Sequence, residues 1–199
     1  QLTNYTSSDS LPTLHILITG LDRKTLHSLR SLRIINCLRG LKLRFYLCTS
    51  EKPLTKTLAE AINLEITSLF DNSEIIFDHT SFDTSEADDD ELIRKPKTSR
   101  HSYSRVFRMY SGIKKSFEMI KKNANSQDLV LRTRTDININ TSFLQIISHA
   151  ISLSQMKNNN YFISTPHPGN GLNEISDIVF ITSYKLMGSI LSFIPAKLD

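Results

Sequence analysis

The sequence predicts an α/β fold with a mostly parallel central sheet and helices on both of its faces. The first observation behind this prediction is an alternation: short apolar runs, typical of buried strands, are separated by longer segments with helical periodicity. The second is the length of 199 residues with 39% hydrophobic and 22% charged residues. Such a chain can build one compact domain with a sizeable core, whereas two domains would be cramped.

The first half of the chain supplies three expected strands and two expected helices. Apolar residues fill 14–19 and 43–48, so both segments are predicted to be buried strands. Residues 23–38 place leucines on one broad face, which predicts a helix. Pro53 is well placed as the first residue of a second helix, where its missing N–H is not needed. A short strand at 75–77 completes a β-α-β-α-β series, which favours parallel pairing.

The alternation breaks at residues 80–100, which contain little apolar sequence. Acidic residues come first in this segment and basic residues follow, so it is either a mobile lid or a solvated, self-neutralising loop. The clearest helix of the chain follows at 102–122, with a continuous apolar stripe. Arg105 and Arg108 lie off that stripe, in the half of the helix expected near the mouth of the sheet.

The last third of the chain continues the α/β pattern. Asn140 or Thr141 can cap a further helix. Apolar runs at 161–163 and 178–181 predict two more strands, and 184–192 is predicted to be helical.

Residues 128–136 carry the most informative pattern of the chain. Leu129, Val130 and Leu131 are typical of a buried strand, and charged residues follow at every second position. If the extended backbone continues, Arg132, Arg134 and Asp136 project to the same face. They then lie at the carboxyl end of a strand, where open α/β sheets bind ligands. This set of side chains suits a phosphorylated ligand, with or without a metal. The alternative is an Arg–Asp ion pair that closes off the strand.

Several other chemistries lack their motifs in this chain. No Gly-x-Ser-x-Gly elbow, P-loop or dinucleotide fingerprint is present, and the six histidines lack the spacing of a zinc site. Cys37 and Cys48 form neither a metal-ligand pair nor a disulfide framework, which favours a reducing compartment. No apolar run is long enough for a membrane span, and the sequence contains no signal-peptide pattern. The net charge of +4 suits anionic substrates or a membrane surface better than nucleic acid.

Transfer of a sugar from a nucleotide diphosphate is compatible with the residues that remain. The leaving diphosphate must be neutralised by a metal or by cationic side chains, and a carboxylate can deprotonate the acceptor hydroxyl. Positive charge can come from Arg105, Arg108, Arg132 and Arg134. Asp136 can hold Mg²⁺ or Mn²⁺ through its oxygens.

Three segments resemble the WavE-type lipopolysaccharide-synthesis proteins, a family of glycosyltransferases with a GT-A-like nucleotide-sugar fold. They are Tyr103-Ser-Arg-Val-Phe-Arg-Met-Tyr-Ser-Gly-Ile-Lys-Lys-Ser116, Asp128-Leu-Val-Leu-Arg-Thr-Arg-Thr-Asp136 and Asp177-Ile-Val-Phe-Ile-Thr-Ser183, with Met187 after them. The resemblance follows the same order over roughly residues 14–190, and its most specific piece is Arg132 to Asp136.

The resemblance implies roles for particular residues. Asp136 stands where GT-A enzymes keep the last acid of their Asp-x-Asp metal motif, so it is the expected ligand of Mn²⁺ or Mg²⁺. The expected donor-binding residues are Arg105, Tyr110, Arg132, Arg134 and Asp136. Asp177, or Glu174 near it, is the expected catalytic base. The chain departs from the motif at Arg134, where an acid is usual, so two hypotheses stay open: a divalent cation serves the site, or Arg134 itself offsets the charge of the diphosphate.

We therefore expect one GT-A-like domain over residues 1–199, acting as a glycosyltransferase in surface polysaccharide or lipopolysaccharide synthesis, including capsule polysaccharide. A nucleotide-sugar is the expected donor, and a saccharide or lipid-linked saccharide is the expected acceptor. Residues 13–79 form the nucleotide-binding βαβαβ half, 80–100 a flexible loop and 101–195 the donor and acceptor half. The missing initiator Met indicates a chain that is processed or taken from a longer protein.

The expected location is cytoplasmic, at the inner face of the membrane with peripheral association, and no nucleic-acid partner is expected. Two alternatives come from other functional classes. One is a non-catalytic fragment of a larger enzyme that binds nucleotide or glycan. The other is a basic module that binds anionic polymers through the cations of 94–115.

Overall fold

The computed structural model describes residues 12–20, 25–38, 41–50, 55–70, 76–82, 103–137, 139–155, 161–164 and 179–192. Within these ranges, the side chains of residues 50, 76–79, 81–82, 103–108, 142 and 164 are not described.

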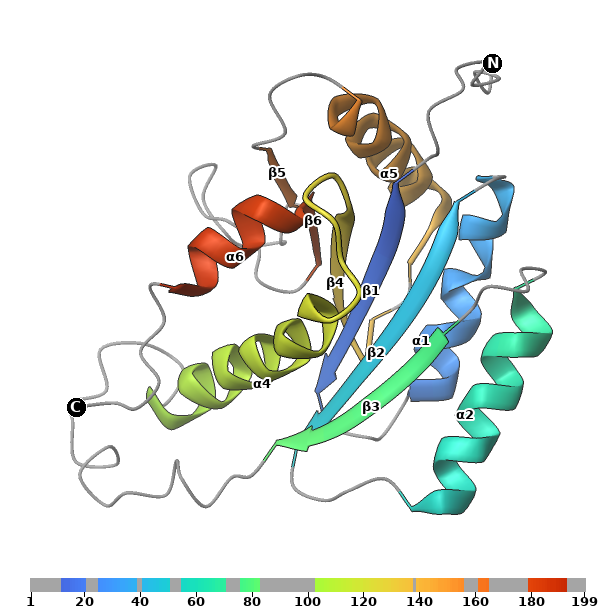
Figure 1. The fold of residues 1–199 in the computed structure, drawn as a ribbon. Coiled ribbons are helices and arrows are strands. Elements are labelled where there is room, and N and C mark those ends of the chain that lie inside the picture. Colours follow the sequence, from blue (N-terminus) through green and yellow to red (C-terminus); the bar gives the residue numbers. More distant parts are fainter. Residues whose placement is uncertain are drawn as a thin grey trace.

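The described part of the chain forms a six-stranded sheet in the order β3-β2-β1-β4-β6-β5 (Figure 1). The strands are β1 (Thr13–Gly20), β2 (Lys42–Ser50), β3 (Ile76–Phe82), β4 (Leu129–Arg134), β5 (Phe162–Ser164) and β6 (Phe180–Ser183). β1 pairs in parallel with β2 and β4, and β2 pairs in parallel with β3. β6 runs antiparallel to both β4 and β5.

The strand order reverses between β1 and β4. The chain moves outward from β1 to β2 and β3, and then returns to place β4 on the other side of β1. In open α/β sheets such a reversal opens a crevice at the carboxyl ends of the two strands, and ligands bind in it. The topology therefore directs attention to the ends of β1 and β4.

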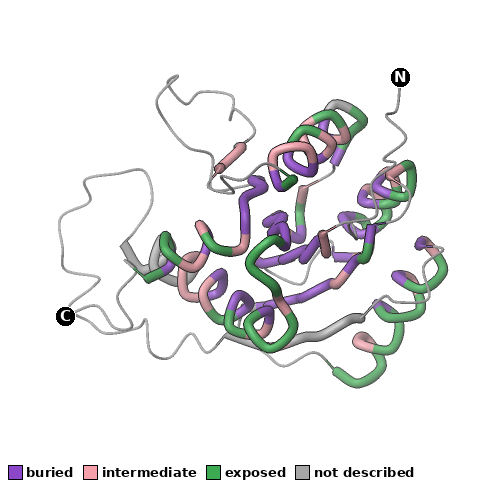
Figure 2. The backbone as a smooth tube through the Cα atoms, turned by 45° about the horizontal axis from the view of Figure 1, so that its top comes forward, coloured by how far each residue is buried: buried purple, intermediate pink, exposed green. Residues whose placement is uncertain are grey.

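Helices cover both faces of the sheet. On one face lie α1 (Thr25–Leu32), the 3₁₀ helix η1 (Arg33–Cys37), α2 (Lys56–Leu69) and α5 (Thr141–Ser154), and on the other lie α4 (Tyr103–Lys121) and α6 (Tyr184–Ser192) (Figure 1). Each described helix turns a buried stripe toward the sheet and an exposed stripe toward solvent (Figure 2). Amphipathic periodicity of this kind is what positions a helix on a sheet.

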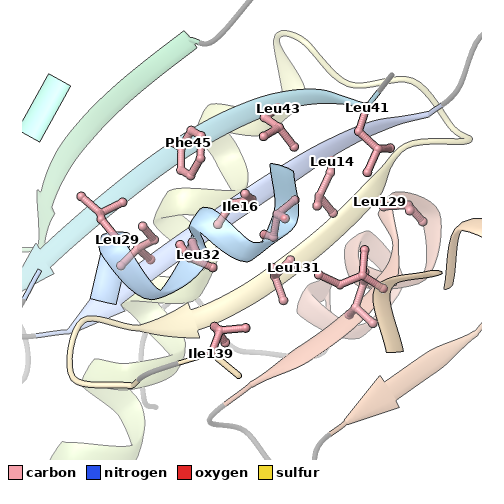
Figure 3. Close-up of a cluster of buried hydrophobic side chains, with 14 of the residues drawn as sticks. Leu14, Ile16, Leu29, Leu32, Leu41, Leu43, Phe45, Leu129, Leu131 and Ile139 are labelled. Atoms are coloured by element: carbon pink, nitrogen blue, oxygen red, sulfur yellow. The ribbon is translucent and has the colours of Figure 1, made fainter. Parts of the chain in front are cut away.

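The core consists of two apolar layers, one on each face of the sheet. Alternate residues of β1 serve them: Ile16 and Ile18 face α1 and α2, whereas Leu17 faces α4. In the larger layer, Leu29 and Leu32 of α1 lie in one buried cluster with residues of β1, β2 and β4 (Figure 3). Burial of one such aliphatic side chain stabilises a fold by roughly 1.5–3 kcal/mol, so the layers fix the sheet and thereby its edges.

The predicted α/β class, the mostly parallel sheet and the helices on both faces are confirmed. Two boundaries are wrong. The second helix does not begin at Pro53 but at Lys56, because Thr55 is extended and its hydroxyl accepts the N–H of Leu58 at 3.3 Å. The predicted loop 80–100 starts too early, because its first residues pair with β2 as part of β3. The rest of that loop lies outside the described residues.

Candidate functional site

The ends of β1 and β4 lie side by side at the reversal of strand order. Thr19 is in register with Arg134, and the N–H of Thr135 donates to the carbonyl of Thr19 at 3.3 Å. The strand predicted from 128–136 therefore brings its charged end to the carboxyl edge of the sheet, at the reversal. We call the residues 132–136 together with Thr19 and Gly20 the switch-point edge.

The expected alternation of side chains ends at Arg134. Residues 135 and 136 form a turn, because the N–H of Ile137 donates to the carbonyl of Arg134 at 3.3 Å. Arg132 and Arg134 still belong to one face of β4. The extended backbone does not continue to Asp136, so the condition for its side chain to join that face is not met, and the turn brings its carboxylate to Arg134.

Arg132 is a buried cation beneath this edge. Its side chain is among the largest fully buried ones, with 1% of the residue exposed. Its Nη2 donates to Oγ1 of Thr19 at 3.1 Å, across from β4 to β1. The guanidinium thus ties the two strands together and contributes its field to the edge from below.

Arg134 and Asp136 form a two-pronged ion pair at the surface. Nε of Arg134 donates to Oδ1 of Asp136 at 2.9 Å, and Nη2 donates to Oδ2 at 2.6 Å. The two side chains are 40% and 44% exposed. These hydrogen bonds hold the pKa of Asp136 below its usual value, helped by the charge of Arg132 and opposed by partial burial. The geometry matches the alternative in which an Arg–Asp pair closes the strand.

The turn after β4 is fastened to α1 by two serines. Oγ of Ser28 donates to the carbonyl oxygens of Arg134 and Ile137, at 3.0 and 2.8 Å. Oγ of Ser31 accepts the N–H of Ile139 at 2.9 Å and donates to the carbonyl of Ser28 at 2.7 Å. The backbone that carries the ion pair is therefore held in place by buried or half-buried hydrogen bonds.

Gly20 lets β1 end close against this turn. Its φ is +141°, a conformation that side chains rarely tolerate, and a Cβ there would lie 2.8 Å from Oγ1 of Thr135. The sequence analysis assigned Gly20 no role at the site. It also missed Ser28 and Ser31, although their spacing of one helical turn beside the leucine stripe was visible in the sequence.

The other predicted site residues divide into two groups. Tyr110 is half-buried and packs against the apolar layer beneath α4. The side chain of Arg105, like Glu174 and Asp177 as a whole, lies outside the described residues.

The described donor set does not fit a divalent cation. Hard cations take several oxygen ligands, and Mg²⁺ is usually bound through one or two carboxylates. Among the residues that the structure describes, no group of three or more His, Cys, Asp or Glu could hold a metal. Asp136 is a single carboxylate, both of its oxygens accept from Arg134, and the charges of Arg132 and Arg134 oppose a dication.

A hollow of about 510 Å³ lies between α1 and α2, and none of the predicted site residues lines it. It is lined by His27, Arg30, Ser31, Arg33, Glu65 and Leu69. Arg30 and Glu65 face each other in it as an ion pair at 2.6 Å. Neither Arg134 nor Asp136 contributes to its lining.

The first residue of the 128–136 segment belongs to a buried network at the opposite, amino edge of the sheet. Oδ2 of Asp128 lies 3.0 Å from Nε2 of His15, and Nδ1 of that ring lies 3.1 Å from the hydroxyl of Tyr46. Backbone N–H groups of Thr13 and Asn125 donate to the same carboxylate, at 3.0 and 2.8 Å. Asp128 therefore fixes the start of β4, while its other end carries the candidate site.

Comparisons with known proteins give solved structures alone: neither a family model nor a curated protein matches the chain. The galactosyltransferase LgtC, in complex with donor and acceptor sugar analogs, is similar with a TM-score of 0.49, 10% identity, and coverage of 87% of this chain and 59% of that one. Glycosyltransferase GlyE of Streptococcus pneumoniae TIGR4 is similar with a TM-score of 0.45 and 11% identity, and the match covers 90% of this chain and 36% of GlyE. The apo form of mouse xyloside xylosyltransferase 1 is similar with a TM-score of 0.44 and 11% identity, and the match covers 93% of this chain and 70% of that one. The chain thus spans 59% of LgtC and 36% of GlyE.

In the part of the chain that the structure describes, no helix is long and apolar enough to cross a membrane.

Proposed function

We propose that the chain is the nucleotide-sugar-binding part of a GT-A-like glycosyltransferase and that the switch-point edge receives the donor's diphosphate. The observation that carries the proposal is the placement of Arg134, exposed and backed by buried Arg132, where the strand order reverses. A guanidinium binds phosphate oxygens through two parallel hydrogen bonds, which suits a diphosphate. The resemblance of 132–136 to the WavE-type proteins supports the same assignment.

The chemistry asks little of these side chains beyond binding and charge. In the transfer, the bond between the sugar's anomeric carbon and the diphosphate oxygen breaks. The acceptor oxygen bonds to that carbon and its proton passes to a base, while the nucleoside diphosphate leaves with the electron pair. Preorganised positive charge at the leaving group stabilises such a transition state. Arg134 serves by contact, and Arg132 serves through its field and by holding Thr19.

Asp177, or Glu174 near it, is proposed as the base on the acceptor side. Both acids lie outside the described residues, but the described chain on either side of their segment reaches the correct edge. Ser164 pairs with Phe180, and Phe180 pairs with Arg132. Asp177→Asn and Glu174→Gln separate the two candidates: the substitution that removes the base should abolish sugar transfer while donor binding is retained.

The acceptor is proposed to be a saccharide or lipid-linked saccharide in surface polysaccharide, lipopolysaccharide or capsule synthesis, at the inner face of the cytoplasmic membrane. The sequence resemblance supports that context. The outer side of α4 adds physical support, because lysines occupy it at 114, 115, 121 and 122 and Glu118 is the acid among them. Such a face is suited to the negative surface of a membrane.

A thermal-shift screen with UDP-, GDP-, CMP- and dTDP-sugars tests the proposal, with and without Mn²⁺. A ligand at a hundred times its Kd stabilises the folded state by about 2.7 kcal/mol, which corresponds to roughly 5–10 °C for a domain of this size. Arg134→Gln should reduce the shift to about half or less at the same ligand concentration. Glu65→Gln, which removes the acid of the exposed pair that Arg30 of α1 makes with α2, should retain it. If no nucleotide-sugar shifts the unfolding temperature in either condition, the proposed function is wrong.

A further inference from the structure

We infer that Asp136 is the resident counter-ion of Arg134, displaced when a diphosphate binds, and that this exchange takes the place of a divalent cation at the switch-point edge. The inference rests on the proposed function for the identity of the ligand. It goes beyond that function by giving the single carboxylate a role opposite to that of a metal ligand.

The geometry of the pair is that of an exchangeable contact. Nε and Nη2 of Arg134 donate to the two oxygens of Asp136, so the carboxylate occupies the fork that a phosphate would use. Both side chains are about two-fifths exposed, so the contact is open to solvent. Exposed pairs of this kind contribute little to stability, and a ligand with more negative charge can replace the carboxylate.

The backbone around the pair is built to stay in place during such an exchange. Ser28 holds the carbonyl oxygens of Arg134 and Ile137, and Thr135 is bonded to the end of β1. The replacement therefore needs rotation of side chains without movement of the strand. A site preorganised in this way loses little binding free energy to reordering.

The charges make the exchange favourable. Among the described side chains of this edge, two arginines and one carboxylate carry one net positive charge while Asp136 is on Arg134. Arg132 is buried and hydrogen-bonded to Thr19, so it stays beneath the edge whatever Arg134 binds. A diphosphate that takes Arg134 meets two cations, and that charge substitutes for the one a metal would supply.

The sign of one substitution distinguishes this role from a metal-ligand role. If Asp136 competes with phosphate for Arg134, Asp136→Asn removes the competitor and tightens binding. If Asp136 holds a cation that bridges to the diphosphate, the same change weakens binding and removes its dependence on metal. Asparagine is nearly isosteric with aspartate, so the turn is preserved in either case.

Isothermal titration of the full chain with inorganic pyrophosphate and with UDP, in EDTA and in Mn²⁺, tests the inference. In EDTA we expect the wild-type chain to bind both ligands. Arg134→Gln should weaken binding about tenfold or more, since it removes charge-assisted hydrogen bonds. Asp136→Asn should tighten binding about two- to fivefold, the range expected for loss of an exposed competing pair. Glu65→Gln is the matched control, and its affinity should equal that of the wild-type chain.

Binding that requires Mn²⁺ and is lost in Asp136→Asn overturns the inference while leaving the proposed function intact. Unchanged affinity of Asp136→Asn in EDTA also overturns it. Failure of the proposed function looks different: pyrophosphate then binds in the pattern expected here, but no nucleotide or nucleotide-sugar binds more tightly than pyrophosphate does. Absence of binding by every ligand, with and without metal, contradicts both.

Discussion

Replacing Asp128 with asparagine should lower the free energy of unfolding by about 2–4 kcal/mol. The wild-type carboxylate is 3% exposed at the residue level and accepts three hydrogen bonds from the protein. Oδ1 serves the N–H of Thr13, and Oδ2 serves both the N–H of Asn125 and Nε2 of His15. An ionised carboxylate can only accept, so the ring donates from Nε2.

The magnitude follows from what asparagine cannot do in the same place. The single oxygen of asparagine can accept either from Thr13 or from the Asn125 and His15 side, and its NH₂ group must then face a donor on the other side. The ring of His15 could switch tautomer and accept from the new amide, but an N–H of Thr13 or Asn125 would still face an N–H. An unsatisfied donor at such a partly buried position costs about 1–3 kcal/mol, and loss of charge weakens the remaining bonds by about another 1 kcal/mol.

Urea denaturation followed by far-UV circular dichroism measures the effect, since the chain has no tryptophan. The midpoint should fall with an unchanged slope. Glu65→Gln, which breaks an exposed acid–arginine pair, should leave the midpoint nearly unchanged. A loss below about 1 kcal/mol for Asp128→Asn would refute the reasoning, because a partly buried N–H that faces the amide NH₂ group should cost at least that much.

The remaining predictions concern the edges and the two thiols. Gly20→Ala should lower the free energy of unfolding by about 1–3 kcal/mol from its strained φ alone. The 2.8 Å approach of the new Cβ to Thr135 should add to this loss, and Thr135→Ala in the same chain should restore the added part. A double-mutant cycle measured by urea denaturation checks this. Burial raises the pKa of Cys48 to about 11, opposed by the charge of Lys115; a maleimide at pH 8 should label Cys37 and spare Cys48 until urea is added, and equal labelling by mass spectrometry contradicts this. Burial opposes ionisation of Asp128, yet its hydrogen bonds hold its pKa below the usual value. Its contribution should therefore be complete above the unfolded pKa of about 3.9 and be lost as the pH falls through the folded pKa, so the wild-type advantage over Asp128→Asn should shrink only in acid.

The sequence predicts the sheet because its signal is local and repeated. Runs such as 14–19 and 43–48 are apolar on both sides of the strand, which only a sheet covered on both faces can use. The placement of Arg132 and Arg134 at the carboxyl end of a buried strand followed from the same signal. The helix start at Lys56 was missed because proline tolerates several positions near a helix start, whereas the cap at Thr55 depends on one backbone conformation.

The contacts at the site could not be predicted, because they join residues far apart in the sequence. The hydroxyl of Ser28 reaches the carbonyl of Arg134 across more than a hundred residues of chain. The turn at residues 135–136 likewise depends on the end of β1, where Thr19 accepts the N–H of Thr135. The sequence contains no local signal for the turn at residues 135–136, so the alternation of side chains was carried on to Asp136. The burial of Arg132 was missed for the same reason, since its partner is Thr19 on another strand.

Because β6 runs antiparallel to β4, its two ends lie at opposite edges of the sheet. Its first residue, Phe180, sits beside Arg132, and after its last residue the N–H of Tyr184 donates to the carbonyl of Asp128 at 2.9 Å. The helix that follows is thus anchored beside the Asp128 network, while β6 begins at the opposite edge, beside Arg132. On the function proposed above, exchange of residues 165–178 for a foreign sequence should alter the choice of acceptor while the framework of strands is preserved.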